Sequence, residues 1–124
     1  MSNYGIVAIE AVQIAKSGIA PDDAWQLAVE KEFTSLPSIK KSCPKNAFLG
    51  LAEDGCIKGI SSGSYTKSRD NKSYSLNALG LLRLDTALAQ NKKELWKKSC
   101  NSNEKTHNGQ MDVVIELWKQ GLVG

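Results

Sequence analysis

The chain has 124 residues, of which 41% are hydrophobic and 23% charged, and its formal net charge is +3. These proportions are ordinary for a globular protein and exclude an intrinsically disordered one, and the length predicts a single domain over residues 1–124. A net charge this small does not by itself indicate a protein that binds nucleic acid.

Apolar spacing and helix-end signals predict helices along the whole chain. The first helix is expected at 3–17 and ends before Gly18, which can adopt a left-handed cap. The second begins at Pro21, whose fixed φ suits the first helical position. Residues 34–41, which contain Pro37, are expected to form a connector.

A third helix is expected from Pro44 to about Asp54. Residues 56–64 combine a short apolar strip with glycines, so a turn, a short strand or a brief helix all remain open there. The pattern over residues 47–64 also hints at a helix-turn-helix.

Residues 71–90 are expected to form the longest helix, with apolar residues around most of its circumference. A helix of this kind lies at the centre of a bundle, with neighbours on several sides. Asp70 or Asn71 is expected to cap it. Gly80 in its middle predicts the close approach of another helix.

Two further helices are expected at 92–100, capped by Asn91, and at 109–120. The polar loop between them contains His107, which is expected to be an exposed loop residue. No segment shows the alternation of a strand. The fold class predicted is therefore all-α, a compact bundle of five or six helices around the central helix at 71–90.

The three cysteines, Cys43, Cys56 and Cys100, include no CxxC pair, which argues against a disulfide framework. The first residues lack the basic and apolar regions of a secretory signal. No apolar run approaches the roughly 18 residues of a membrane helix. We therefore expect a cytoplasmic protein that has no membrane association.

Cys43 precedes Pro44 and is expected to be the N-cap of the third helix. Backbone N–H groups and the helix dipole would stabilise a thiolate there, so an enzyme or redox sensor with Cys43 as its reactive thiol is one hypothesis. The alternative is an inert cysteine that fixes the helix start. One histidine and unpaired thiols indicate no metal site, and we expect no cofactor.

Residues 63–74 interleave aromatic and basic side chains ahead of a helix start. Cations and aromatic rings in this pattern suit a phosphate or a single-stranded nucleic acid, although basic loops are commonly just solvated. The candidate ligand- or anion-binding residues are Lys45, Tyr65, Lys67, Arg69, Lys72 and Tyr74.

Several segments resemble a family of small uncharacterised bacterial proteins, a domain of unknown function. They are residues 41–60 (KSCPKNAFLGLAEDGCIKGI), 63–66 (GSYT), 71–74 (NKSY), Tyr4-Gly5 and Ala24-Trp25. Similar small proteins are carried on mobile gene cassettes such as those of integrons. The resemblance implies an accessory role and supplies no catalytic residues.

Three functions remain open after these observations. The first is a non-enzymatic binding module for a protein or a small ligand, one form of which is a homodimer through exposed helix faces. The second is a nucleic-acid or phosphate binder that uses residues 63–74, and the third is the Cys43 enzyme or sensor. The second and third predict that one cleft is lined by Cys43, Lys45, Tyr65, Arg69 and Lys72.

Overall fold

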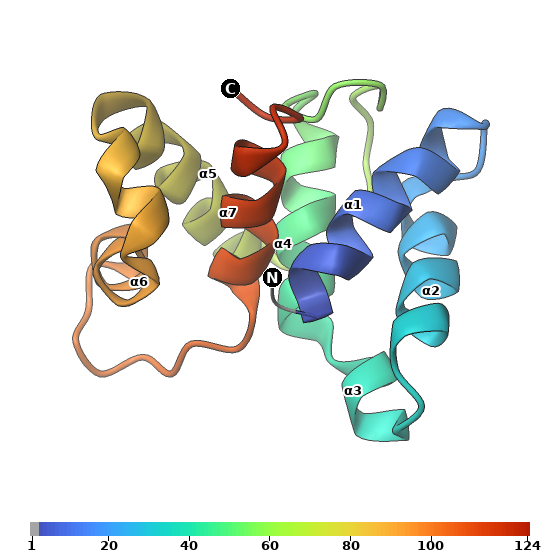
Figure 1. Ribbon diagram of the computed structural model, residues 1–124, viewed down its shortest axis with the longest axis horizontal. Helices are drawn as coiled ribbons and strands as arrows, with labels where there is room; N and C mark the ends of the chain where they lie inside the picture. Colours follow the sequence, from blue (N-terminus) through green and yellow to red (C-terminus); the bar gives the residue numbers. More distant parts are fainter. Residues whose placement is uncertain (1–2) are drawn as a thin grey trace.

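The computed structural model describes residues 3–124, which fold into helices with no β-strand among them (Figure 1). The elements are α1 (Asn3–Lys16), α2 (Pro21–Glu32), α3 (Leu36–Lys40), α4 (Ser42–Glu53), α5 (Arg69–Leu84), the 3₁₀ helix η1 (Thr86–Gln90), α6 (Lys92–Cys100) and α7 (Gln110–Lys119). The prediction of an all-α fold is confirmed.

The helices α4 and α7 lie in the middle of the molecule, with α1 and α2 on one side and α5 and α6 on the other (Figure 1). Seven of the ten residues of α7 are buried, and so are seven of the twelve in α4. The helix α5 buries four of its sixteen residues while packing against α4, α6, α7 and η1. The centre of the bundle is therefore formed by α4 and α7, and α5 covers one side of it.

The core is built mainly from the apolar faces of the helices, together with residues of the loop between α4 and α5. The rings of Trp25 in α2 and Phe48 in α4 pack at 5.3 Å between centroids, and both are fully buried. The largest other fully buried side chains are Leu51, Ile57, Leu79, Leu82, Leu95, Met111 and Leu117. Burial of this kind contributes about 1.5–3 kcal/mol for each large side chain.

Local end signals were good predictors where a cap lies next to its helix. The helix α2 begins at Pro21, and the Asn91 side chain accepts the Glu94 N–H at the start of α6. Residues 36–40 were predicted wrongly as part of a connector. They form α3 because the Ser35 hydroxyl accepts the Ser38 N–H, and Pro37 stands in the first turn, where its missing N–H is not needed.

The helix predicted at 71–90 is shorter than expected at its C-terminal end. It ends at Leu84, and the Asp85 carboxylate accepts the Ala87 N–H to begin η1. Its N-cap is Ser68 instead of Asp70 or Asn71. The Leu84 residue is 88% exposed, so this helix is not apolar and buried around its whole circumference.

A close approach between helices occurs at Gly50 in α4. A Cβ atom there would lie 2.7 Å from the Cα of Lys72 in α5, so only glycine fits this crossing. A Cβ at Gly80 would meet nothing within 4 Å. The close approach predicted at Gly80 was therefore wrong.

Residues 54–68, the α4–α5 loop, contain no helix or strand, so the helix-turn-helix hint was wrong. Of the three alternatives for residues 56–64, the turn is confirmed: the Ile60 N–H donates to the Ile57 carbonyl (3.2 Å). The loop is tied down by backbone hydrogen bonds: the Gly63 N–H donates to the Glu53 carbonyl (3.1 Å) and the Lys58 N–H to the Leu122 carbonyl (2.8 Å). No helix in the described part of the chain has both the length and the apolar character needed to span a bilayer.

Candidate functional site

A groove of about 700 Å³ lies where the α4–α5 loop meets the first turns of α5. Its walls are polar for the most part, with one large apolar side chain. The residues that line it are Glu53, Ser64, Thr66, Lys67, Arg69, Lys72, Ser73 and Leu76. Three of the candidate residues, Lys67, Arg69 and Lys72, are therefore gathered at one place.

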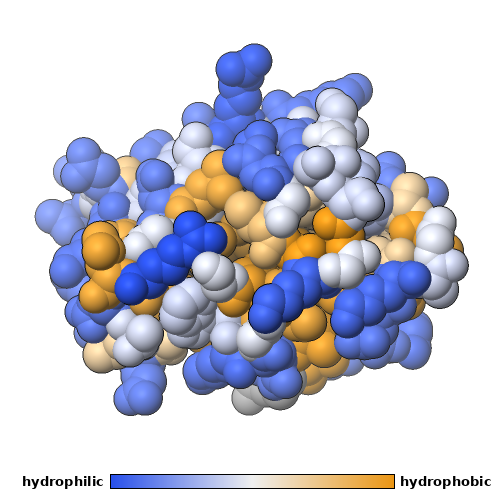
Figure 2. Space-filling model, turned by 90° about the horizontal axis from the view of Figure 1, so that it is seen from above, coloured by the Kyte–Doolittle hydropathy of each residue, from blue (hydrophilic) through white to orange (hydrophobic). Residues whose placement is uncertain are grey.

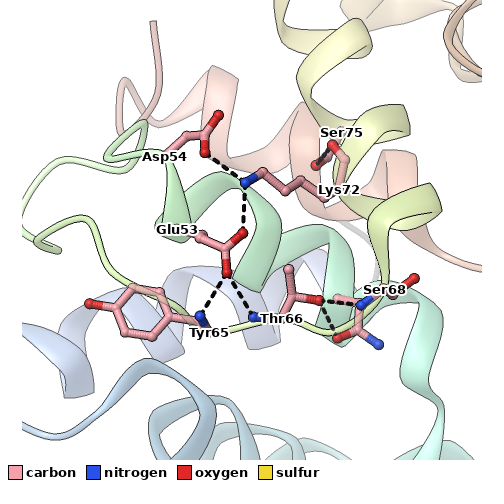
Figure 3. Close-up of polar contacts among 8 residues, drawn as sticks. Glu53, Asp54, Tyr65, Thr66, Ser68, Lys72 and Ser75 are labelled. Atoms are coloured by element: carbon pink, nitrogen blue, oxygen red, sulfur yellow. Dashed lines mark hydrogen bonds and ion pairs between the residues drawn. The ribbon is translucent and has the colours of Figure 1, made fainter.

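The Glu53 carboxylate organises this groove from the last turn of α4 (Figure 3). Its Oε1 accepts the backbone N–H groups of Tyr65 (2.8 Å) and Thr66 (3.2 Å), and its Oε2 accepts the Lys72 ammonium (2.6 Å). These bonds favour the charged carboxylate, the Lys72 bond most, and lower the pKa of Glu53 to about 2. The loop is thus attached to α4 and α5 by one ionised side chain.

The Lys72 ammonium is shared between two carboxylates. Besides Glu53, it contacts Asp54 Oδ1 at 2.8 Å. Hydrogen bonds to Asp54 and then Glu53 raise the pKa of Lys72, so it stays protonated with its charge paired (Figure 3). The candidate anion-binding residue Lys72 accordingly holds helices together instead of presenting a free charge.

A short chain of hydrogen bonds forms the start of α5. The Thr66 hydroxyl donates to Asn46 Oδ1 (2.8 Å) and accepts the Ser68 N–H (3.1 Å). The Ser68 hydroxyl in turn accepts from the Asn71 side-chain amide (3.0 Å), and Asn71 Oδ1 accepts from Gln110 in α7 (3.0 Å). The groove is thereby connected to the N-terminus of α7.

Lys67 and Arg69 are the cations at the groove whose charges are not paired. Both residues are exposed, and neither forms an ion pair with any residue from 3 to 124. Figure 2 views the molecule from the top of Figure 1, where part of the α4–α5 loop lies, and shows hydrophilic residues interspersed with apolar ones on that face. Two free cations beside a polar groove form a weakly positive rim.

The other candidate residues lie outside the groove lining. The Tyr65 hydroxyl donates to the Ser61 carbonyl (2.7 Å), which folds the ring back on its own loop. Tyr74 packs edge-on against Trp96 at 5.2 Å, and Lys45 is a half-buried residue of α4. The alternating aromatic and basic residues in the sequence are therefore separated in space.

Cys43 is the second residue of α4, and Lys41 instead of Cys43 occupies the N-cap position. Cys43 is half-buried, and no hydrogen bond joins its thiol to His107. Of the five residues expected to share a cleft, Arg69 and Lys72 line the groove, whereas Cys43, Lys45 and Tyr65 do not. Within residues 3–124 no cluster of three or more His, Cys, Asp or Glu side chains is arranged to hold a metal ion.

His107 was expected to be exposed, but it is half-buried. Its Nε2 accepts the Met111 N–H at 2.9 Å, and its ring packs against Trp96 at 5.4 Å. The N–H groups in the first turn of a helix lack an intrahelical acceptor. The available sequence signal for this role is that His107 stands four residues before Met111, close enough to accept such an N–H.

Glu53 was not identified from the sequence. Its partner Lys72 lies 19 residues away, and the backbone groups it binds belong to an irregular loop. The one available signal was an acidic pair, Glu53 and Asp54, at the end of a helix, where negative charge is unfavourable and a cation is needed.

A family model described as a family of unknown function (DUF6979) matches residues 1–124. The chain belongs to this family. No curated protein and no solved structure matches the chain.

Proposed function

We propose that this member of a family of unknown function is a non-enzymatic binding module that holds a small anionic ligand in the groove beside α5. The observation that carries the proposal is the position of Lys67 and Arg69. Their charges have no ion-pair partner within residues 3–124, and they line the groove together with the hydroxyls of Ser64 and Ser73.

The dimensions of the groove support a small ligand. Its volume of about 700 Å³ lies in the range of small-molecule sites, about 300–1,000 Å³. Arg69 supplies a planar set of N–H donors that fits a carboxylate or phosphate, and Lys67 supplies a point charge. Because Glu53 and Asp54 carry two negative charges against the single positive charge of Lys72, only Lys67 and Arg69 remain to bind an anion, and the groove is suited to one anionic group more than to a polyanion.

The positions of the aromatic residues support a small anion over a nucleic acid. Binding of single strands uses aromatic faces on which bases stack, and Tyr65 and Tyr74 are engaged with Ser61 and Trp96. The nucleic-acid alternative predicts that labelled single-stranded DNA or RNA binds at low salt and is released as salt rises.

The position of His107 supports a function without catalysis. A nucleophilic cysteine is ordinarily activated by a base within hydrogen-bond reach, and the His107 Nε2 is occupied by the Met111 N–H. The Cys43 alternative predicts that iodoacetamide alkylates this thiol faster than a free peptide thiol across the neutral pH range. An equal rate would contradict that alternative.

The cellular setting is part of the same proposal: an accessory protein of the bacterial cytoplasm, of the kind carried on mobile gene cassettes. Three cysteines without a disulfide suit a reducing compartment. Association into a homodimer is a further form of the proposal, and light scattering at two protein concentrations tests it. A monomer at both would contradict it.

The groove is tested by NMR titration with inorganic phosphate and then with a nucleoside monophosphate. We expect the amide signals of residues 64–73 to shift on addition of the anion. The double variant Lys67→Gln/Arg69→Gln should bind at least about tenfold more weakly, since each lost charge-assisted hydrogen bond contributes roughly 1.5–3 kcal/mol.

The matched control is Lys93→Gln/Lys98→Gln, which removes two exposed charges from α6 and leaves the groove unchanged. If anion binding were weakened equally in both double variants, the anion would be responding to the net charge of the protein alone. That result, or signals that shift elsewhere on the protein, would overturn the proposed site.

A further inference from the structure

His107 holds the N-terminus of α7 through a single ring nitrogen. Its Nε2 accepts the Met111 N–H at 2.9 Å, in the first turn of a helix whose N-cap, Gly109, has no side chain to offer. The first N–H groups of a helix have no intrahelical acceptor, so this bond supplies one of them. With Nε2 as the acceptor, the proton of the neutral ring resides on Nδ1.

Residues 101–109, the α6–α7 loop, cover aromatic side chains next to this histidine. The Trp96 indole N–H donates to the Lys105 carbonyl (2.9 Å), and the Lys105 ammonium lies 5.9 Å from the Tyr74 ring centroid. The His107 ring itself packs on Trp96. The loop thus forms one side of a small aromatic cluster, and His107 joins that cluster to α7.

We propose that His107 is a pH-sensitive cap: the neutral imidazole holds the α6–α7 loop against Trp96 and α7, and protonation releases it. A protonated imidazole has two N–H donors and no acceptor, so it cannot receive the Met111 N–H. Its positive charge would also face the positive end of the α7 dipole. Both effects oppose the bound arrangement of the ring.

The charged groups around His107 do not compensate for this cost. Asp112 in α7 favours the imidazolium, but its carboxylate is already paired with Lys92 of α6 at 2.8 Å. Lys92 itself and Lys41, the N-cap of α4, both disfavour a second positive charge. Burial is the largest influence, and the net effect is a pKa of His107 below its ordinary 6.5.

The direction of the pH effect follows from this shift. The folded chain binds protons at His107 less readily than the unfolded chain, so protonation favours the released or unfolded state. The contribution of His107 to the free energy of unfolding is therefore fully present above pH 6.5 and declines as the pH falls from 6.5 toward the lower folded-state pKa. Since this is the single histidine of the sequence, side-chain titration in this range can be assigned to it.

The experiment combines NMR titration of the His107 ring with hydrogen exchange at two capped amides. Between about pH 7.5 and 5, exchange at the Met111 amide, corrected for its intrinsic rate, should rise at least about tenfold as the ring titrates. The Glu94 amide is the internal control, because its acceptor is the Asn91 side-chain oxygen, which does not titrate. A ring that titrates while the Met111 amide stays protected would overturn the proposal.

Two variants separate titration from packing. His107→Gln keeps an acceptor that does not titrate and should abolish the pH dependence of Met111 exchange. Lys92→Met leaves Asp112 unpaired and should move the midpoint of the transition to higher pH. Should His107→Gln fail to fold, the wild-type titration and Lys92→Met still decide. A Lys92→Met midpoint that is unchanged or lower would contradict the electrostatic basis.

Discussion

The α4–α5 loop (54–68) and the α6–α7 loop (101–109) are held in place by the same kind of bond. In each, one titratable side chain accepts backbone N–H groups: Glu53 from Tyr65 and Thr66, and His107 from Met111. Both loops lack helix and strand, and both precede a helix of the core.

The two acceptors differ in the pH range over which they remain deprotonated and can accept a hydrogen bond. The pKa of Glu53 is about 2, so its acceptor persists at any pH at which the protein would ordinarily function. The pKa of His107 lies below its ordinary 6.5 because the ring is partly buried, and its acceptor is lost as the pH falls through that lower value. The chemical nature of the anchoring group therefore sets the pH range over which each loop is ordered, although the hydrogen bond itself is similar.

The largest expected effect comes from filling the space at the crossing of α4 and α5, the two helices that the first loop joins. Gly50→Ala places a methyl group 2.7 Å from the Lys72 Cα, and backbone cannot yield as a flexible side chain can. We expect a loss of about 1–3 kcal/mol in the free energy of unfolding, measured by urea denaturation. Hydrogen exchange at Met111 should be affected much less, since its cap belongs to the other loop.

The matched control for this change is Gly80→Ala. It is also a glycine inside a helix, but its added Cβ meets nothing within 4 Å. Alanine has the better helix propensity, so a gain of up to about 1 kcal/mol is expected. A loss of stability for Gly50→Ala together with a gain for Gly80→Ala would establish that α4 and α5 approach closely at Gly50. A gain in stability for both variants would contradict it.

An intermediate effect is expected from Glu53→Gln. The neutral amide oxygen accepts the backbone N–H groups more weakly than the carboxylate does, and the ion pair with Lys72 is lost, so exchange at the Tyr65 and Thr66 amides should accelerate several-fold at pH 7. Because the folded pKa of Glu53 is depressed, its contribution exists above the unfolded value of 4.5 and disappears as the pH falls toward about 2.

The difference in stability between wild type and Glu53→Gln should accordingly shrink over that acidic range. Glu104→Gln is the control, since Glu104 is an exposed residue of the second loop. A difference that stays constant from pH 7 to 2 would show that the Glu53 charge is not what holds the first loop.

The smallest expected effect is that of Ser68→Ala. It removes the N-cap hydroxyl of α5, whose bond to the Asn71 N–H is long at 3.4 Å, so a loss of about 0.5–1 kcal/mol is expected. The loss should be the same at pH 7.5 and pH 5, whereas the difference in stability between wild type and His107→Gln should shrink as the pH falls. A pH-dependent loss at Ser68 would break the distinction between the two loops.

Helix positions could be predicted from the sequence wherever the deciding contact is local. Pro21 and Asn91 identified the starts of α2 and α6 because each acts on its own first turn. The end of α5 was misplaced because apolar spacing continues through Leu88, while Asp85 ends the helix by bonding to the Ala87 N–H. Spacing reports which face is apolar and does not report where the backbone leaves the helix.

The candidate site could be predicted only in part, for a related reason. Lys67, Arg69 and Lys72 are close in sequence, so their presence at one groove followed from local order. That Glu53 and Asp54 neutralise Lys72, and that Gly50 instead of Gly80 lies at the crossing, depend on how α4 and α5 meet. A single sequence contains no signal for the pairing of two particular helix faces.

The hydrogen bond between Asn71 and Gln110 joins the start of α5 to the start of α7. Asn71 also bonds the Ser68 cap beside the groove, whereas Gln110 precedes the Met111 amide that His107 holds. If anion binding orders the start of α5 and, through this bond, the start of α7, it favours the neutral ring of His107, and protonation of His107 then weakens anion binding by the same factor. Anion affinity of the groove would then depend on pH, and this coupling could be measured either as a change in anion affinity or as a change in the pKa of His107.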